Sequence, residues 1–344
     1  MQDYSNKLLY LLIIILLFAN CDDVTKSKKI EDNQPSTIVE LYGQLQVEGN
    51  KITDQNGEAI SLHGMSLFWS QWIDKYYNKN AIQWLKDDWK CTIIRVPLGV
   101  EPDGYLENPI QELNKVKTAV EACIDLGLYV IIDWHDHNAH EHTEDAKIFF
   151  KQMAILYGEY PNVIYEIYNE PENCSWSQDV KPYAEEIISA IREHDSDNLI
   201  TVGSPHWAQD VDIATADPIE DPNLAYSLHF YAAAHKQELR NKAAIALSRG
   251  FALFVNEFGI CDYTGDGDID QQSTNEWMNF MDNMKISWCK WSVADKDEGD
   301  AVLEENADPD GGWTDNDLKP SGKLIRQLII DRNQKIYNQL NIDN

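Results

Sequence analysis

Short apolar runs recur eight times along the sequence, and a helical pattern follows almost every one of them. The runs are residues 60–67, 91–97, 129–134, 163–168, 199–202, 225–230, 252–258 and 286–293. Helical patterns cover residues 82–89, 110–126, 146–157, 180–192, 236–249, 272–284 and 323–338, and the connection at 210–222 is the weakest. Successive runs lie about 30 residues apart, which is the size of one βα unit. The pattern therefore predicts an α/β protein built as one (β/α)8 TIM barrel.

A doubly wound parallel sheet is the alternative fold for such a pattern. No GxGxxG motif follows any of the runs, which argues against the dinucleotide-binding form of that fold.

Residues 43–60 precede the first run, alternate in hydrophobicity and contain turn signals at Gly49-Asn50 and Asn56-Gly57. We expect a short N-terminal β-hairpin there.

The N-terminus has the features of an export signal. Residues 8–19 are apolar without interruption, too short for a bilayer-spanning helix but typical of a secretory signal. The run ends at Phe18-Ala19-Asn20-Cys21, which resembles a bacterial lipoprotein signal with Cys21 as the lipidated residue. A plain signal peptide and a buried N-terminal helix are the alternatives. The lipoprotein interpretation predicts export and anchoring at the outer membrane or cell surface, whereas a plain signal predicts secretion.

Three segments follow from this interpretation. Residues 1–20 would be the signal, residues 21–37 a flexible polar tether, and residues 38–344 the folded domain.

The chain has 28 Lys and Arg against 58 Asp and Glu, a formal charge of −30. Such a surface repels nucleic acid and anionic lipid, so we expect membrane contact only through a lipid anchor. The 11 Trp and 16 Tyr instead provide flat rings that suit the faces of sugars. We expect the protein to be a monomer.

Polar residues gather where the predicted strands end, which is the face on which TIM barrels carry their active sites. They are His63, Arg95, His135, Asn169, Glu170, His229, Tyr231, Glu257 and Trp291. Glu170 follows the fourth run and Glu257 lies at the end of the seventh, so they could flank one glycosidic bond as a catalytic pair. Taken singly, each glutamate could be a surface or ion-paired residue, Arg95 could be structural, and His135 and Trp291 could belong to the core.

Six short motifs strengthen this hypothesis. They are IRVP (94–97), DWH (133–135), YEIYNEP (165–171), HFY (229–231), NEFG (256–259) and KWS (290–292), and together they resemble glycoside hydrolase family 5. The resemblance covers about residues 40–335, and HGMSLFWSQW (63–72) and WSVADKDEG (291–299) resemble the bacterial endo-β-1,4-glucanases of subfamily 2. It implies a (β/α)8 barrel that cleaves with retention of configuration and needs neither cofactor nor metal.

The resemblance also implies a role for each matching residue. Glu170 corresponds to the general acid/base and Glu257 to the nucleophile. Asn169 would bind the sugar 2-hydroxyl, Arg95 and Tyr231 would hold Glu257 ionised, His135 and His229 would orient the carboxylates, and Trp291 would lie under the reacting sugar. His63, Trp69, Lys296 and Glu298 match positions on the non-reducing side, and Trp207 matches one on the leaving-group side. Residues 173–176 look less standard, so the leaving-group side is less well defined.

The expected substrate is a β-glucan polysaccharide or a cello-oligosaccharide. A mannanase or a mixed-linkage glucanase would use the same chemistry and differ only in its hydroxyl contacts. A non-catalytic glycan-binding lipoprotein would be expected to lack one carboxylate, whereas this chain has both Glu170 and Glu257. The acidic loop from Asp262 to Asp270 fits either a solvated turn or a calcium site, although Trp277 stands where an EF-hand count would need glutamate.

Overall fold

The computed structural model describes residues 34–341, and from Pro35 onward the chain forms one compact unit. The predicted signal segment and Cys21 lie outside the described residues. The predicted tether therefore also lies outside them, apart from its last four residues, 34–37.

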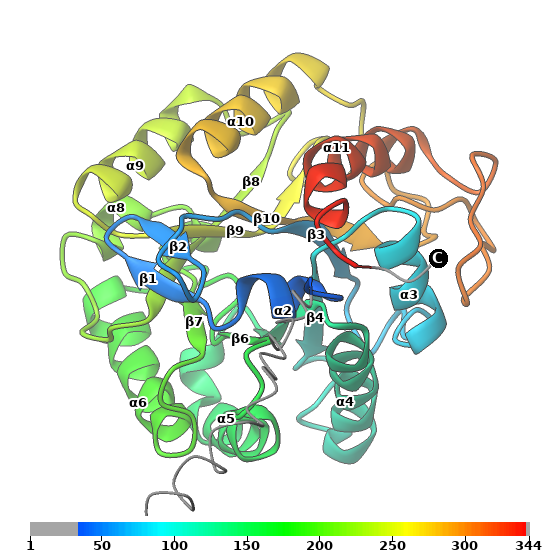
Figure 1. Ribbon diagram of the computed structural model, residues 1–344. Helices are drawn as coiled ribbons and strands as arrows, with labels where there is room; N and C mark the ends of the chain where they lie inside the picture. Colours follow the sequence, from blue (N-terminus) through cyan, green and yellow to red (C-terminus); the bar gives the residue numbers. More distant parts are fainter. Residues whose placement is uncertain (1–33, 342–344) are drawn as a thin grey trace, which may run out of the picture. The chain divides into compact units, whose positions relative to one another are not determined.

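Eight parallel strands close into a barrel, as the repeated pattern predicts (Figure 1). Around the barrel they follow the order β10-β3-β4-β5-β6-β7-β8-β9. Their bounds are β3 (His63–Leu67), β4 (Ile93–Gly99), β5 (Tyr129–His135), β6 (Val163–Glu166), β7 (Leu199–Val202), β8 (Leu224–Tyr231), β9 (Leu253–Gly259) and β10 (Ser287–Val293). Nearly every strand residue is buried, because one face packs into the barrel and the other lies under helices. This is why the strands read as continuous apolar runs in the sequence.

Helices cover the outside of the barrel (Figure 1). The main ones are α3 (Lys79–Asp87), α4 (Pro109–Leu126), α5 (Thr143–Tyr157), α6 (Lys181–Arg192), α9 (Gln237–Ser248), α10 (Gln271–Met284) and α11 (Pro320–Tyr337). The fifth connection, predicted to be the weakest helix, contains only the short turns α7 (Pro205–Ala208) and α8 (Val211–Ala214). Helix α4 ends as its sequence predicts, because Gly127 adopts the left-handed conformation, with φ of 66°, that caps a helix.

The predicted hairpin is present and closes the bottom of the barrel. Strands β1 (Gln46–Glu48) and β2 (Lys51–Thr53) pair antiparallel, after the short helix α2 (Ile38–Tyr42). The backbone N–H of Val47 donates to Asn223 Oδ1 at 2.7 Å, and the Tyr129 hydroxyl donates to the Gly43 carbonyl at 2.6 Å. Asn223 precedes β8 and Tyr129 begins β5, so the hairpin covers the ends where the strands start. The opposite end of the barrel remains available for a site.

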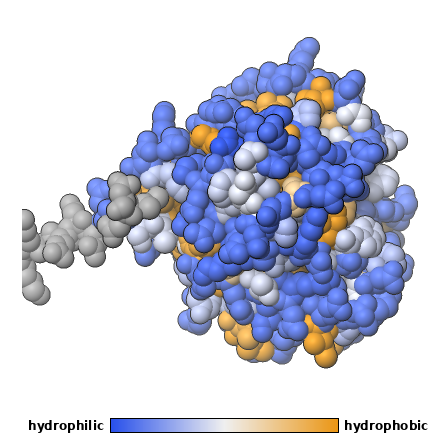
Figure 2. Space-filling model, turned by 90° about the vertical axis from the view of Figure 1, so that its right-hand side faces the viewer, coloured by the Kyte–Doolittle hydropathy of each residue, from blue (hydrophilic) through white to orange (hydrophobic). Residues whose placement is uncertain are grey.

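The face of the molecule seen in Figure 2 is mostly hydrophilic, with separate small hydrophobic patches. Among residues 34–341, no helix has both the length and the apolar character needed to cross a membrane.

Candidate active site

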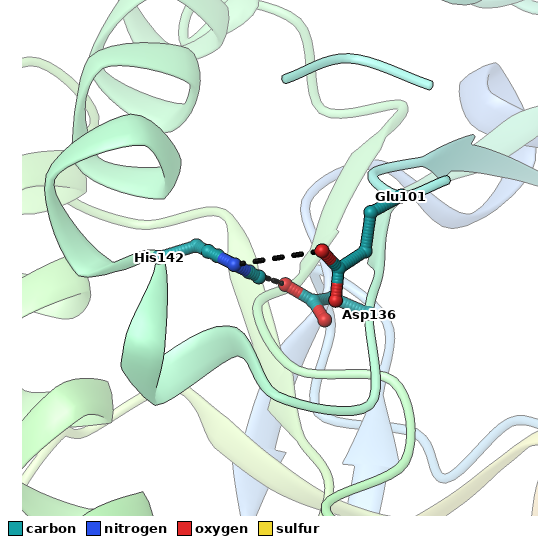
Figure 3. A group of neighbouring side chains, drawn as sticks. All are labelled: Glu101, Asp136 and His142. Carbon is teal, nitrogen blue, oxygen red and sulfur yellow. Dashed lines mark hydrogen bonds and ion pairs between the residues drawn. The ribbon is translucent and has the colours of Figure 1, made fainter. Parts of the chain in front are cut away.

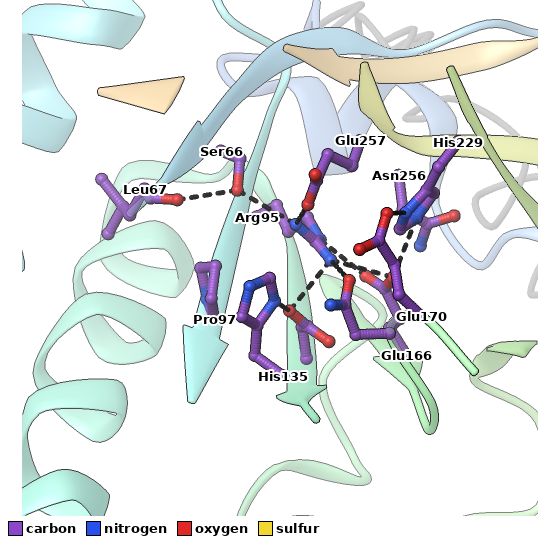
Figure 4. A network of polar contacts seen from close by, with 12 residues as sticks. Ser66, Leu67, Arg95, Pro97, His135, Glu166, Glu170, His229, Asn256 and Glu257 are labelled. Atoms are coloured by element: carbon purple, nitrogen blue, oxygen red, sulfur yellow. Dashed lines mark hydrogen bonds and ion pairs between the residues drawn. The ribbon is translucent and has the colours of Figure 1, made fainter. Parts of the chain in front are cut away.

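The strand ends bring the predicted catalytic residues together at one end of the barrel (Figure 4). Arg95 lies within β4, His135 ends β5, and Asn169 and Glu170 follow β6. His229 and Tyr231 end β8, Glu257 lies within β9 and Trp291 within β10. Strands β6 and β9 are separated by β7 and β8, so the two glutamates reach the centre from well-separated parts of the barrel wall.

Arg95 is the centre of a buried hydrogen-bond network (Figure 4). Its Nη1 donates to Glu257 Oε2 at 2.8 Å, and its Nη2 donates to Asn169 Oδ1 at 2.6 Å. Its Nε and Nη2 also donate to Glu166, at 2.7 Å and 3.1 Å, and its Nη1 donates to the Ser66 hydroxyl at 3.4 Å. Burial disfavours the charged guanidinium, but the surrounding carboxylates raise the pKa of Arg95 well above its usual value. Arg95 therefore remains cationic beside Glu257.

Two members of this network, Asp133 and Glu166, were not predicted from the sequence. Asp133 Oδ2 lies 3.0 Å from Arg95 Nη2 and 2.7 Å from His135 Nδ1. Glu166 makes the bidentate pair with Arg95. Both acids are fully buried inside apolar strand runs, and a charge in such a place needs a partner. An acidic residue inside an apolar strand run is therefore the sequence signal that could have identified Asp133 and Glu166 as members of a buried network.

Asn169 is held with its amide nitrogen free for a ligand. Its oxygen accepts the hydrogen bond from Arg95, so the Nδ2 group must donate elsewhere. Nδ2 is buried and contacts no acceptor among the described residues. A buried donor without a partner is costly, and a sugar hydroxyl would satisfy it.

The two glutamates are close enough to act on one anomeric carbon. One carboxylate oxygen of Glu170, one of Glu257 and one ring nitrogen of His229 all lie within 4.8 Å of one another. Retaining glycosidases hold their carboxyl groups about 5–5.5 Å apart, whereas inverting enzymes need about 6.5–9.5 Å to admit water. The spacing therefore fits attack by one glutamate rather than attack by a water placed between them.

Different donors surround the two glutamates. Glu257 accepts from Arg95 at 2.8 Å and from the Tyr231 hydroxyl at 2.8 Å, and both donors favour its anion. Glu170 contacts His229 Nδ1 at 3.0 Å. Glu257 is thus placed for nucleophilic attack, and Glu170 for proton transfer.

The pKa shifts of the two glutamates run against these roles. Burial and the charge of Glu170 raise the pKa of Glu257, while His229 lowers the pKa of Glu170 against the effect of burial. Taken alone, these directions would leave the proton on Glu257. The hydrogen bonds place the proton elsewhere, because it can reside on His229 Nδ1 and move along its 3.0 Å contact to Glu170, while Arg95 and Tyr231 hold Glu257 as the anion. His229 and Glu170 are thus positioned to share one proton.

The pH dependence of kcat/KM is expected to be bell-shaped. On the acid side, activity falls when Glu257 takes up a proton, above the usual glutamate range because its pKa is raised. Burial opposes the charged form of His229, but Glu166 and Glu170 raise the pKa of His229 to about 9, so the alkaline limb lies near that pH. The variant H229Q is expected to move the alkaline limb to lower pH and to lower kcat about 10- to 100-fold. An unmoved alkaline limb in H229Q would show that His229 does not hold the catalytic proton.

Aromatic rings lead from the carboxylates along one side of the cleft. Trp291 stacks on His135 with ring centroids 5.1 Å apart and an interplanar angle of 9°. Trp69 meets the other side of this group, with its ring centroid 4.0 Å from that of His135 and edge-on to it. The predicted floor residue Trp291 and the predicted platform Trp69 are thus brought together by His135.

Lys296 and Glu298 also lie on this side. They form an ion pair, and the ammonium group of Lys296 is 4.8 Å from the centroid of the Phe68 ring, next to Trp69 in sequence. Their polar groups therefore stand beside the aromatic surface, as expected for residues that bind sugar hydroxyls.

A cavity of about 780 Å³ opens on the other side of Glu170. Trp207 lines it and is 40% exposed, which fits the predicted leaving-group side. The predicted residues Glu170, His229 and Tyr231 line it as well, whereas His137, His206, Lys242 and Tyr263 also line it and were not predicted from the sequence. These four residues come from separate loops and from helices α7 and α9, so only the folded chain brings them together.

His63 does not belong to the site, which corrects the prediction made from the sequence. It is the first residue of β3, at the barrel end opposite the carboxylates, and it is 5% exposed. Its Nδ1 contacts Asn333 in α11 at 2.7 Å, and its ring packs on Trp288. Burial lowers the pKa of His63 to about 4, so the ring is a neutral core residue. The apolar run showed a strand but not which end of it His63 occupies.

Within residues 34–341, two groups of three potential metal ligands come within 4.8 Å of one another. One is the catalytic group of Glu170, His229 and Glu257, and the acidic loop from Asp262 to Asp270 forms no such group.

The second group is Glu101, Asp136 and His142 (Figure 3). Asp136 Oδ2 contacts Nδ1 of His142 at 2.7 Å, whereas Glu101 Oε2 lies 3.9 Å from its Nε2. The two carboxylates face different ring nitrogens, so the group is an ion-paired bridge between loops rather than three ligands converging on one point.

The barrel and its paired glutamates define a glycoside hydrolase of the two-carboxylate type. Comparison with known families agrees, because residues 53–297 match the family described as "Cellulase (glycosyl hydrolase family 5)". The chain belongs to glycosyl hydrolase family 5.

Individual relatives are similar over most of this chain. Endoglucanase A of Evansella cellulosilytica is 47% identical over 278 residues, which is 79% of this chain and 57% of that protein. The chain thus spans little more than half the length of that relative. A structure from Cytophaga hutchinsonii is 51% identical, with a TM-score of 0.88, and covers 88% of this chain and 100% of its own. The catalytic domain of a Thermobifida fusca endoglucanase, solved as a variant with cellotetraose, is 35% identical, with a TM-score of 0.82 and coverage of 85% and 99%.

Proposed function

We propose that this protein is an endo-β-1,4-glucanase that hydrolyses internal bonds of β-glucan chains with retention of configuration. The observation that carries the proposal is the close approach of Glu170 and Glu257 at the open end of the barrel, within 4.8 Å. The relatives named endoglucanase support the choice of glucan as substrate. The cellotetraose bound to the Thermobifida fusca variant supports cello-oligosaccharides as shorter substrates.

The proposed mechanism is a double displacement. A carboxylate oxygen of Glu257 forms a bond to the anomeric carbon while the bond from that carbon to the leaving oxygen breaks. Glu170 gives the leaving oxygen its proton, which the contact with His229 supplies. Glu170 then takes a proton from water, whose oxygen displaces Glu257 and restores the starting configuration.

The network around Arg95 supports the charge changes in this mechanism. Arg95 and Tyr231 stabilise the anion of Glu257 before attack and again when it leaves. Asn169 would donate from Nδ2 to the sugar 2-hydroxyl, a contact that strengthens in the transition state. Trp291 would pack under the reacting sugar.

Substrate choice is tested by parallel assays of the purified protein on carboxymethylcellulose, barley mixed-linkage glucan and mannan. We expect reducing-sugar release from the two glucans together with a rapid fall in viscosity, which indicates cleavage within chains. Preference for mannan would overturn the substrate but keep the paired glutamates. No release from any of the three would overturn the proposed activity.

We also propose that the protein is exported and anchored to a membrane by lipid on Cys21, with the barrel as a monomer outside the membrane. Support comes from the apolar segment 8–19 followed directly by a Cys-containing motif. The variant C21S is expected to move most of the protein from the membrane fraction to the soluble fraction of the producing bacterium. Unchanged membrane association in C21S would show that Cys21 is not the anchor.

A further inference from the structure

The short helix α7 contains a stretch of left-handed backbone. His206, Trp207 and Ala208 have φ angles of 55°, 55° and 56°, and the ψ angles of the first two are 57° and 53°. Residues with a Cβ atom rarely adopt these values even singly, because Cβ then crowds the following carbonyl oxygen. Three such residues in succession are strained, so contacts with other parts of the molecule must hold them in place.

The left-handed stretch determines where the indole of Trp207 points, because φ and ψ set the direction of the bond from Cα to Cβ. The backbone N–H of Trp207 donates to the carbonyl of Pro171 at 3.0 Å, and Pro171 directly follows Glu170. The backbone N–H of Ala208 donates to the carbonyl of Ser204 at 2.9 Å. The ring that lines the leaving-group cavity is thus tied to the loop that carries the proton donor.

Asp210 is a buried carboxylate that connects the left-handed stretch to helix α9. Its Oδ2 pairs with Nδ1 of His206, and its Oδ1 accepts from Lys242 Nζ at 2.5 Å. Its backbone N–H donates to the carbonyl of Pro205 at 3.2 Å. Burial opposes the charged form, but the hydrogen bonds from Lys242 and His206 lower the pKa of Asp210 below its usual value. The carboxylate is therefore an anion near neutral pH.

The usual role of an aspartate at this position does not explain the carboxylate of Asp210. The residue stands at the N-cap of α8, where an aspartate side chain commonly accepts from a backbone N–H of the first turn. Here the side chain makes no such hydrogen bond, and the backbone carbonyl alone accepts from Ile213 and Ala214, both at 3.0 Å. The carboxylate therefore serves the left-handed stretch rather than the helix that it precedes.

We propose that Asp210 is a positioning residue for the leaving-group side of the cleft, because its hold on His206 and Lys242 keeps Trp207 in place against the departing sugar. This inference rests on the proposed function, because it takes a β-1,4-linked glucan as the ligand. In this role Asp210 acts through Trp207 and takes no part in breaking the bond. Its loss weakens the binding of leaving sugar units and leaves the chemistry of the two glutamates unchanged.

The test compares two substrates that differ in their leaving group. Cellopentaose must place sugar units beside Trp207, whereas β-cellobiosyl fluoride loses only a single atom. D210A is expected to lower kcat/KM for cellopentaose about tenfold, mainly through KM, and to change kcat/KM for the fluoride by less than about twofold. D210N keeps the shape of the side chain but not its charge, so a smaller loss of the same kind is expected. D210N carries the test if D210A does not fold.

A double variant separates positioning from other roles of Asp210. If Asp210 acts through Trp207, adding D210A to W207A is expected to cause little further loss on cellopentaose. If the two losses multiply instead, Asp210 contributes independently of Trp207, for example as a direct sugar contact, and the inference is wrong.

The matched control is D221A, which removes another buried carboxylate that pairs with a cation. Asp221 lies 2.9 Å from Arg192, and its side chain is 5% exposed, against 4% for Asp210. It precedes β8, at the end of the barrel where the strands start, so D221A is expected to affect both substrates by the same small factor. If D210A also lowers both activities by one factor, the role of Asp210 is wrong while the proposed function stands. If the unchanged protein does not cleave cellopentaose, the proposed function fails, and the inference fails with it.

Discussion

Replacing Glu257 by alanine is expected to lower kcat about 10⁴-fold or more, because the variant lacks the carboxylate that forms the bond to the anomeric carbon. Arg95 and Tyr231 both direct their hydrogen bonds to this carboxylate. The alanine variant leaves a small space beside the sugar that azide can enter. Azide is expected to restore part of the activity on an aryl cellobioside and to give the α-glycosyl azide, since it attacks once from the face that Glu257 used.

Glu170 provides the matched control for that experiment. E170A is expected to retain the first step on an aryl cellobioside with a good leaving group, because such a group departs without a proton. Azide would then attack the glycosyl–Glu257 bond and give the β-glycosyl azide. If the two variants gave products of the opposite configurations, the roles of Glu170 and Glu257 would be reversed.

The variant R95M is expected to cause the largest loss of stability of any single change at the site. Arg95 is fully buried and pairs with Asp133, Glu166 and Glu257. Without its charge these acids remain buried and uncompensated, which is expected to lower the free energy of unfolding by about 3–5 kcal/mol near neutral pH. Chemical denaturation measures that loss directly.

R95M also tests how Glu257 is kept ionised. The guanidinium lowers the pKa of Glu257, so its removal is expected to move the acid limb of the kcat/KM profile to higher pH. R95K keeps a charge but loses the bidentate pair with Glu166, and it is expected to fall between R95M and the unchanged protein. An acid limb that stays in place in R95M would contradict the support that we assign to Arg95.

Much of the fold was predictable because a parallel barrel imposes a simple pattern on the sequence. Its strands are buried on both faces, so they read as apolar runs, and each is followed by a helix. Glu170 and Glu257 were predictable as a pair because both lie where such runs end. The short helix α8 lies within residues 210–222, the connection predicted to be the weakest helix.

Other parts of the site depend on information that the sequence pattern does not contain. His63 was misplaced because an apolar run does not show which of its residues begins the strand. Asp133 and Glu166 sit among apolar neighbours, and only the folded barrel brings them to Arg95.

The most direct test of the central claim is the configuration of the first product. Cellopentaose is added to the protein, and proton NMR spectra follow the new anomeric signals before mutarotation mixes them. Attack by Glu257 followed by attack of water inverts the anomeric carbon twice, so the β anomer is expected to appear first. Initial appearance of the α anomer would mean a single displacement by water, and it would contradict the assignment of Glu257 as nucleophile.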